Sequence, residues 1–352
     1  MATIKDLLAA AIAKGCSDLH ITVGVKPKCR VNGLLVEMEE FGKLLPPDTK
    51  MIVESMLTTR QQEEIDDNGE VDFAYSIPEI GRFRVNAFKQ RGSYAAVLRI
   101  VGTKIPAPEK LGIPASVVDL KNRKRGLVLV TGPTGSGKST TLASLIDLIN
   151  TEKNAHIITL EDPIEYLHNH KRSIVNQREI GLDTMSYANA LRAALREDPD
   201  IILVGEMRDL DTISTAITAA ETGHLVFSTL HTIGAAPTID RIIDVFPTNQ
   251  QAQIQVQLAS VLECVVSQQL LPTIDGKGRA AAFEIMLASP AIRNLIREGK
   301  THQIPSIIQT SKKLGMQMMD DALFELYLKR KIDGRHAVEY AQDQFAMQGK
   351  LL

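Results

Sequence analysis

The sequence predicts an α/β protein of two domains, with an N-terminal α+β domain followed by a parallel-sheet domain that has a helical C-terminal part. Three observations support this prediction. The chain has 352 residues, more than a single domain usually holds. From residue 126 onward, continuous apolar runs alternate with helical patterns, which is typical of a parallel sheet covered on both faces. Between the two regions lies a short stretch rich in Gly and Pro.

The N-terminal domain is predicted to span residues 1–101 and to mix short helices with strands. Alternating apolar and polar residues indicate strands in "SDLHITV" and "KCRVNGLLVEM", with a turn at Asn32-Gly33. Helical patterns follow in "PPDTKMIVESML" and "RQQEEID". Three further strands are expected around "VDFAYSI", "GRFRVNAFKQR" and "SYAAVLRI".

Residues 102–118 are predicted to be the interdomain linker. The stretch "GTKIPAPEKLGIPA" contains two glycines and three prolines, too many for a regular helix or strand. A composition of this kind is typical of a connection between domains.

The second domain is predicted to span residues 119–352. Its expected parallel strands are "GLVLVT", "AHIITL", "DIILVG" and "HLVFSTL", separated by helices such as "TTLASLIDLIN" and "YANALRAALRE". Beyond residue 250 the pattern becomes largely helical, in "QAQIQVQLASVLECVV", "SPAIRNLIREG" and "MQMMDDALFELYLKRK".

Composition and charge restrict the classes of function. The formal net charge of −2 and the pI of about 6.5 give no support to a generic nucleic-acid binder. Cys16, Cys29 and Cys264 are widely spaced, which favours buried, reduced thiols over disulfides or a zinc site. The N-terminus lacks a signal-peptide pattern and no uncharged apolar run reaches membrane-spanning length. We therefore expect a soluble, cytoplasmic protein.

The stretch "GPTGSGKST" directly follows the apolar run "GLVLVT" and matches the phosphate-binding loop pattern G-x-x-x-x-G-K-[ST]. Glycines let the backbone curl so that several N–H groups point at phosphate oxygens, and the following helix N-terminus adds partial positive charge. Lys138 is expected to reach the β- and γ-phosphates, and the Ser139 hydroxyl to bind Mg²⁺. The sequence thus predicts binding of ATP with Mg²⁺ by Gly132, Pro133, Thr134, Gly135, Ser136, Gly137, Lys138, Ser139 and Thr140.

Two acidic sites follow other predicted core strands. Glu206 ends the strand "DIILVGE", and the carboxyl ends of parallel strands lie beside the phosphate crevice. We expect Glu206 to activate the attacking water. The segment "EDPIEYLH" follows the strand "HIITL", so Glu161 and Glu165 are further catalytic candidates, and Asp162 is a candidate for contact with the metal.

Two histidines bracket the strand in "GHLVFSTLHT". His231 stands at the end of the strand, where it could sense the γ-phosphate or its hydrolysis. His224 stands at the start of the strand, so we expect it at the opposite edge of the sheet and leave its role open.

Four segments, "GPTGSGKST", "TLEDPIEY", "LREDPDIILVGEMRD" and "GHLVFSTLHT", resemble in this order the Walker A, Asp box, Walker B and His box of the secretion-ATPase superfamily. Its members are motors of type II secretion and type IV pili. The late segment "AIRNLIREGK" resembles a helix of the retraction motors, which serve twitching motility. The family's extension motors often carry a four-cysteine zinc site, which three scattered cysteines cannot form.

The resemblance implies a PAS-like N-terminal domain, a RecA-like ATPase domain and assembly into a hexameric ring that drives pilus retraction. It implies a location at the cytoplasmic face of the inner membrane, with an inner-membrane platform protein as partner, and an extension ATPase or a paralogue as a further candidate. Arg84 and Arg99 match the two arginine fingers of the family's N-terminal domain, and we expect them to complete a neighbouring subunit's site. No nucleic-acid partner is expected.

Three alternatives remain open from the sequence. The chain could be a related secretion or pilus-assembly ATPase or an accessory paralogue, an ATP-dependent switch with negligible turnover, or a RecA-like DNA motor. A water-activating Glu206 argues against the switch, and the balanced charge argues against the DNA motor. The helix at 291–298 has an apolar stripe and a polar face with Arg293 and Arg297, which fits either a functional surface or a plain solvated helix.

Overall fold

The structure is a computed structural model that describes residues 3–31, 33–78, 80–101 and 104–351. The chain divides into two compact units. The N-terminal unit comprises residues 1–104 together with 165–167, and the second unit comprises residues 105–164 and 168–352. Asn32, Gly102 and Thr103, which belong to the predicted turn and linker, lie outside the described residues.

The N-terminal unit is an antiparallel six-stranded sheet with three helices. The strand order is β3-β2-β1-β6-β5-β4. Strand β5 alternates, with Phe83, Val85 and Ala87 fully buried and Arg84 exposed, so one face of the sheet covers the core. The elements are α1 (Ile4–Ala13), β1 (Asp18–Ile21), β2 (Lys28–Val31), β3 (Leu34–Glu37), α2 (Pro46–Glu54), α3 (Thr59–Asn68), β4 (Glu70–Ile77), β5 (Gly81–Gln90) and β6 (Ser93–Ile100).

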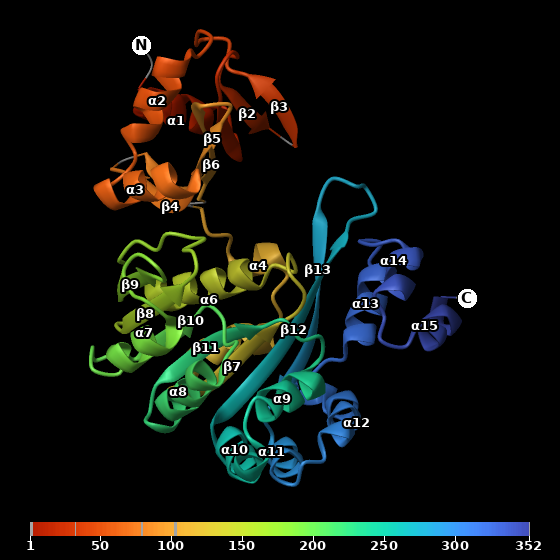
Figure 1. Ribbon diagram of the computed structural model, residues 1–352. Coiled ribbons are helices and arrows are strands. Elements are labelled where there is room, and N and C mark those ends of the chain that lie inside the picture. The colour runs from red at the N-terminus through yellow and green to blue at the C-terminus, as the bar shows by residue number, and fades with distance from the viewer. Residues whose placement is uncertain (1–2, 32, 79, 102–103, 352) are drawn as a thin grey trace. The chain divides into compact units, whose positions relative to one another are not determined.

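The second unit contains a seven-stranded sheet in the order β13-β12-β7-β11-β10-β8-β9 (Figure 1). Its strands are β7 (Gly126–Thr131), β8 (His156–Glu161), β9 (Ile174–Glu179), β10 (Ile201–Val204), β11 (Leu225–Leu230), β12 (Leu262–Pro272) and β13 (Arg279–Leu287). All pairs are parallel except β12 with β13.

Helices cover both faces of this sheet. They are α4 (Pro108–Leu111), α5 (Ala115–Val118), α6 (Lys138–Glu152), α7 (Tyr187–Ala194), α8 (Leu210–Glu221), α9 (Ala235–Asp244), α10 (Thr248–Val261), α11 (Pro290–Arg297), α12 (Ile304–Thr310), α13 (Met319–Leu328), α14 (Gly334–Glu339) and α15 (Gln344–Leu351). Short 3₁₀ turns lie at η1 (Asp119–Asn122), η2 (Thr301–Gln303) and η3 (Lys312–Leu314).

The burial of β7 shows why the central strands are apolar throughout. All six of its residues are buried. Leu127 and Leu129 pack in one hydrophobic cluster with side chains of α7 to α12, while Val128 and Val130 pack in another with side chains of α5 and α6. A strand covered on both faces has no polar side, so the predicted α/β class and its parallel sheet are confirmed.

Three expectations about the fold are wrong. The helix predicted over "QAQIQVQLASVLECVV" ends at Val261, and the chain continues as the long antiparallel pair β12 and β13. Strand β9 was not predicted at all. Within the predicted linker, α4 and α5 are regular helices, and Ile113 and Val117 are buried in the core of the second unit. Glycine and proline there mark helix ends, with Gly112 in the left-handed conformation after α4.

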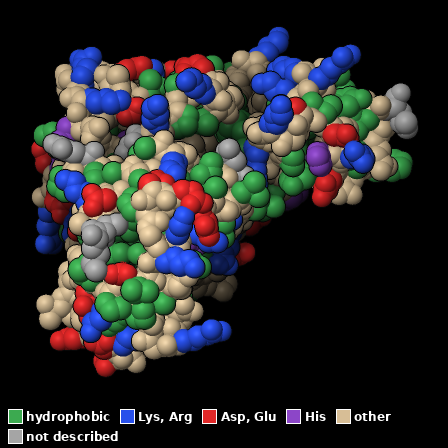
Figure 2. Space-filling model, turned by 90° about the horizontal axis from the view of Figure 1, so that it is seen from above, with side chains coloured by type: hydrophobic (Ala, Val, Ile, Leu, Met, Phe, Trp, Pro, Cys, Tyr) green, Lys and Arg blue, Asp and Glu red, His purple; other side chains and the backbone are tan. Residues whose placement is uncertain are grey.

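The cysteines and the helices can be compared with the composition of the chain. Cys16, Cys29 and Cys264 are buried and form no disulfide. None of the described helices is long and apolar enough to cross a membrane. On the face in Figure 2, acidic and basic side chains are interspersed.

Candidate functional site

The predicted phosphate-binding loop connects β7 to α6, at the carboxyl edge of the parallel sheet. Three of its glycines have positive φ: Gly132 at 140°, Gly135 at 80° and Gly137 at 89°. A Cβ on Gly132 would collide with the main-chain oxygen of Gln268, so this position has no room for a side chain. The backbone can curl tightly here only because these residues are glycines.

The loop's polar side chains divide by burial. Lys138 is buried, and its Nζ donates to the carbonyl oxygens of Gly132 and Pro133 at 2.8 and 3.1 Å. Ser136 is also buried, and its Oγ has no hydrogen-bond partner among the described residues. Ser139 is exposed at the first turn of α6, where backbone N–H groups lack partners within the helix.

The remaining loop residues lie at the surface of the loop. Pro133, Thr134 and Gly135 are exposed, and Thr140 is half-buried in the first turn of α6. Thr134, Gly135 and Thr140 each have a backbone N–H, the group through which such a loop holds phosphates, whereas Pro133 has none.

Gln268 on β12 supports this loop, and the sequence analysis did not find it. Its Oε1 accepts a hydrogen bond of 2.8 Å from Thr141 Oγ1, with both residues buried. A Cβ on Gly137 would lie 2.9 Å from Gln268 Nε2. The signal in the sequence was a polar pair, "QQ", inside the apolar run "CVVSQQLL". That run was assigned to no strand, so its polar pair had no predicted place.

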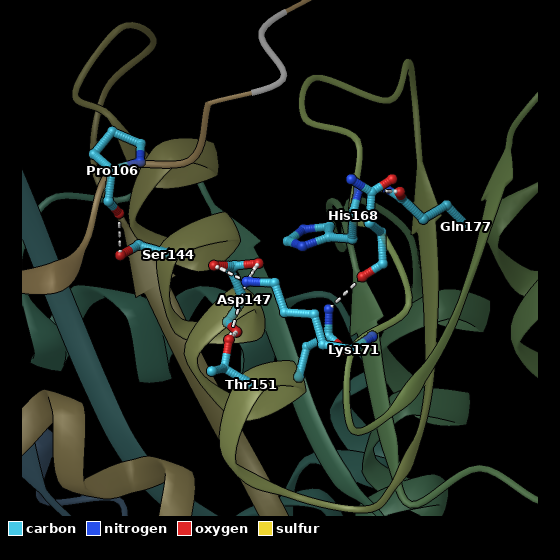
Figure 3. Close-up of polar contacts among 9 residues, drawn as sticks. Pro106, Ser144, Asp147, Thr151, His168, Lys171 and Gln177 are labelled. Atoms are coloured by element: carbon cyan, nitrogen blue, oxygen red, sulfur yellow. Dashed lines mark hydrogen bonds and ion pairs between the residues drawn. The ribbon is translucent and has the colours of Figure 1, made fainter. Parts of the chain in front are cut away.

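The outer side of α6 is anchored by polar contacts to two other segments (Figure 3). Ser144 Oγ donates to the Pro106 carbonyl at 2.7 Å. Lys171 Nζ contacts both carboxylate oxygens of Asp147, at 2.7 and 2.8 Å, and Thr151 Oγ1 at 3.0 Å. Burial lowers the pKa of the neighbouring His168 to about 4, so this ring is neutral at physiological pH.

Glu206 lies just beyond β10 and accepts two contacts on one oxygen. Arg208 Nε donates to Glu206 Oε1 at 2.6 Å, and His231 Nε2 lies 3.1 Å from the same atom. Burial acts to raise the pKa of Glu206, but the hydrogen bond from Arg208 and the nearby His231 together hold it below its usual value. Glu206 is therefore ionised at neutral pH, and it contacts His231 from the end of the neighbouring strand β11.

Glycine at position 205 is required by its surroundings. A Cβ there would lie 2.9 Å from Tyr187 Oη and 3.1 Å from the Leu160 carbonyl oxygen. The Gly205 carbonyl accepts a 2.6 Å bond from Thr229 Oγ1. These close contacts fix the backbone that carries Glu206.

Glu161, Asp162 and Tyr187 lie together with Glu206 at this edge. Burial raises the pKa of Tyr187, and the charges of Asp162, Glu206 and Glu161 raise it further. Glu161 Oε1 accepts hydrogen bonds from Thr159 Oγ1 at 2.7 Å and Gln177 Nε2 at 3.1 Å. Asp162 is exposed. Tyr187 was missed by the sequence analysis, since a single tyrosine at a helix start carries no signal of its own.

Three predicted site residues belong to the N-terminal unit. Glu165 is exposed in the segment 165–167 that groups with that unit. Arg84 and Arg99 are exposed and stand directly opposite each other on β5 and β6. The structure therefore brings Glu161, Asp162, Glu206 and His231 to the edge of the sheet that carries the phosphate-binding loop, while Glu165, Arg84 and Arg99 lie on the other unit.

Two further residues from the sequence analysis have defined surroundings. His224 precedes β11, at the end of the strand opposite to His231, and its Nδ1 lies 2.9 Å from the Ala219 carbonyl oxygen. Arg293 lies on the polar face of α11, which the sequence left open between a functional surface and a plain solvated helix, and its side chain is partly buried. Its guanidinium donates to the carbonyls of Ala259 and Ser260 at 2.7 and 2.9 Å and to Glu263 at 2.7 Å.

The chain matches the family model described as "Type II/IV secretion system protein" over residues 1–326. The chain belongs to this secretion-protein family. Together with the complete phosphate-binding loop, this membership makes it an ATPase, and the resemblance drawn from the four motifs is confirmed.

Individual relatives of this secretion-family ATPase cover nearly its whole length. It is 48% identical over 343 residues to the type IV pilus retraction ATPase PilT of Pseudomonas aeruginosa, covering 96% of this chain and 98% of the relative. It is 49% identical over 318 residues to a twitching motility protein of Neisseria gonorrhoeae, covering 90% and 83%. The crystal structure of the pilus retraction motor PilT with bound ADP superposes with a TM-score of 0.92 at 50% identity, covering 99% of this chain and 100% of that one.

Proposed function

We propose that this ATPase drives retraction of type IV pili. The observation that carries the proposal is the phosphate-binding loop with Glu161, Glu206 and His231 at one edge of the sheet, in a chain similar over nearly its full length to pilus retraction ATPases. The sequence segment "AIRNLIREGK", formed by α11 and the residues after it, supports assignment to the retraction motors.

In this proposal, each residue of the second unit has a defined task. The loop amides and Lys138 bind the phosphates, and Lys138 exchanges its two carbonyl partners for phosphate oxygens. Glu206 accepts the proton of the attacking water, since it is ionised and His231 and Arg208 contact its carboxylate and orient it. Glu161 assists as a further carboxylate at the same edge of the sheet, and Glu165, which belongs to the N-terminal unit, is proposed as another catalytic carboxylate.

The residues present fit a Mg²⁺ ion held mainly by the nucleotide. Among the described residues, no three His, Cys, Asp or Glu side chains cluster as a metal cage. Mg²⁺ at nucleotide sites is commonly held by phosphate oxygens, water and only one or two protein ligands. Ser139, exposed at the helix start, and Asp162, exposed at the end of β8, are suitable ligands. Bound there, the ion would neutralise charge on the phosphates.

The finer architecture is part of the proposal. We assign the N-terminal unit as PAS-like and the second unit as RecA-like, and we propose that six chains form a ring. Arg84 and Arg99 then contact the γ-phosphate as arginine fingers. The ring is proposed to act at the cytoplasmic face of the inner membrane on a platform protein, with a paralogue or an extension ATPase as a further partner.

The test compares Lys138→Ala with Glu206→Gln in hydrolysis, nucleotide binding and retraction. Lys138→Ala should weaken nucleotide binding, because it removes a phosphate contact. Glu206→Gln should bind ATP normally and fail to hydrolyse it, because the amide keeps the shape but cannot accept the proton. Cells with either variant should make pili that do not retract. Near-normal hydrolysis by Glu206→Gln would contradict the assigned role.

A further inference from the structure

A row of charged side chains crosses the sheet of the N-terminal unit. Arg84 on β5 is registered opposite Arg99 on β6, and Arg99 is registered opposite Asp18 on β1. Asp18 is in turn opposite Arg30 on β2. Directly opposite residues of antiparallel strands project from the same face, so three arginines and one aspartate lie side by side.

This row lies on the face of the sheet that points away from the core. The sequence neighbours Phe83, Leu98 and Leu19 are fully buried, and side chains alternate along a strand. Arg84 and Arg99 are exposed. Asp18 is an exception, since it is only 6% exposed despite its place on this face.

The pairing of Arg84 with Arg99 is unfavourable by itself. Like charges directly opposite each other destabilise a sheet. Asp18 offsets part of this repulsion. Its Oδ1 accepts a 2.9 Å bond from Arg99 Nε, and its Oδ2 accepts a 2.8 Å bond from Ser17 Oγ.

The way in which Asp18 holds Arg99 leaves part of the guanidinium available. The contact uses Nε, and neither terminal nitrogen of Arg99 has a hydrogen-bond partner among the described residues. A guanidinium bound through Nε still presents both terminal nitrogens on one edge, which is the geometry that grips two phosphate oxygens. The Arg99 side chain is 70% exposed, so this edge is open to a ligand.

We propose that Asp18 is a positioning residue for Arg99: it fixes the guanidinium through Nε so that the opposite edge receives the γ-phosphate. The proposal rests on the arginine role given above. A mobile arginine loses side-chain entropy when it binds a phosphate, whereas an arginine already held in place loses less. Asp18 also supplies a negative charge that offsets the repulsion between Arg84 and Arg99 on neighbouring strands.

Burial acts to raise the pKa of Asp18, but the hydrogen bonds from Arg99 and Ser17 hold it below the usual value. Asp18 is thus ionised at neutral pH, as its role requires. A neutral side chain of the same shape is the direct test.

The experiment measures Asp18→Asn in the full-length protein, alone and combined with Arg99→Ala. Asp18→Asn should lower kcat about tenfold, as expected for the loss of one charge-assisted contact that orients a catalytic group. It should weaken binding of a non-hydrolysable ATP analogue and leave ADP binding unchanged, since ADP has no γ-phosphate. Combined with Arg99→Ala, it should lower kcat no further.

The matched control is Asp72→Asn, which changes an exposed aspartate on the same sheet and should keep wild-type rates. Melting temperatures report whether each variant folds. If Asp18→Asn does not fold, Arg99→Lys replaces it. Lysine keeps the charge beside Asp18 but lacks the two-nitrogen edge, so Arg99→Lys should be as slow as Arg99→Ala. A wild-type rate for Arg99→Lys would overturn the proposal.

Further outcomes separate this inference from the proposed function. A wild-type rate for Arg99→Ala would reject the arginine role and the inference with it. A slow Arg99→Ala with a normal Asp18→Asn would reject the inference alone. Asp18→Asn could instead lower kcat by the same factor in the wild-type protein and in Arg99→Ala, or weaken ADP binding as much as binding of the ATP analogue. Either result would mean that Asp18 acts on the fold and not through Arg99.

Discussion

At the scale of single residues, the proposed role of Glu206 as the base depends on the contacts of its carboxylate. Its one carboxylate oxygen contacts both Arg208 and His231, and both contacts favour the ionised form. A base that is already ionised and oriented needs no further preparation before it accepts a proton from water.

Arg208→Ala should shift the acid limb of the pH–rate profile to higher pH. Without the guanidinium, burial still acts to raise the pKa of Glu206 while its main counter-influence is lost. Because Glu206 must be ionised to act as a base, activity then falls away at a less acidic pH. The check is kcat measured as a function of pH, with Arg241→Ala as control. Arg241 lines the pocket that Glu206 and Arg208 also line, but it forms no hydrogen bond to Glu206 among the described residues. An unchanged acid limb would show that Arg208 does not set this pKa.

Sequence motifs identified the candidate site residues, but they did not identify the residues that support the site. Lys138, Glu206 and His231 follow apolar strands in short, specific motifs, so their common edge could be predicted. Gln268 and Tyr187 act through packing and hydrogen bonds with residues far away in the chain. Contacts of this kind depend on the folded neighbourhood and leave no local pattern.

At the scale of elements, β12 joins the nucleotide site to the C-terminal region. Gln268 reaches the phosphate-binding loop, and the next residue, Gln269, faces the other way and donates to the Tyr340 carbonyl at 3.4 Å. The strand was mistaken for the end of a helix because its apolar run directly continues the pattern of α10. Periodicity alone cannot separate a buried strand from a buried helix.

Gln268→Leu should weaken nucleotide binding. The substitution leaves the buried Thr141 hydroxyl without its partner, at a cost of about 1–3 kcal/mol, and it removes the side-chain amide that lies beside Gly137. Gln269→Leu is the matched control and should leave the affinity for ADP unchanged, because its side chain lies on the other face of the strand. Calorimetric titration with ADP measures both. Equal affinities in the two variants would contradict the role given to Gln268.

Substitutions in helix α11 can test whether ATP hydrolysis is coupled to pilus retraction. The structure favours Arg297 over Arg293 as the residue to substitute. Arg293 donates hydrogen bonds at the end of α10, so Arg293→Ala should destabilise the second unit by about 2–3 kcal/mol. A loss of retraction in that variant would then not be distinguishable from a loss of folded protein. Arg297 is exposed. If the polar face of α11 couples the ring to its partner, Arg297→Ala should hydrolyse ATP normally while cells make pili that do not retract.

If α11 is a plain solvated helix, Arg297→Ala should retract pili normally, because substitution of an exposed arginine typically changes stability by less than about 0.5 kcal/mol. Hydrolysis and twitching measured in the same variant decide between the two. Loss of both together with loss of hexamers would assign the helix to assembly.

At the scale of the whole molecule, the proposed ring makes each site depend on two chains. Arg84→Ala subunits and Lys138→Ala subunits should each be inactive, since an arginine finger is worth about 10³–10⁵ in rate in GTPases. If the fingers act on the neighbouring subunit, mixed hexamers should recover part of the activity. The measurement is ATPase activity of mixed rings whose composition is confirmed by mass. No recovery in confirmed mixed rings would place Arg84 in its own subunit's site.

The sequence pattern indicated two units, but it did not indicate the structure of the stretch between them. Alternating strands and helices identified the parallel sheet, and the N-terminal strands lie where expected. The breaker-rich stretch was taken for a linker because its glycines and prolines were read as interruptions. In the structure they cap two short helices whose apolar side chains belong to the second core.

The folded-back position of Lys138 has a consequence for nucleotide exchange in the proposed motor. Its ammonium is buried, and it donates to two carbonyl oxygens of its own loop. Carbonyl and phosphate oxygens are both hydrogen-bond acceptors, so the loop's own backbone can satisfy a buried charge that would otherwise be costly. Under the proposed function, we therefore expect a subunit to exchange one nucleotide for the next without unfolding of this loop.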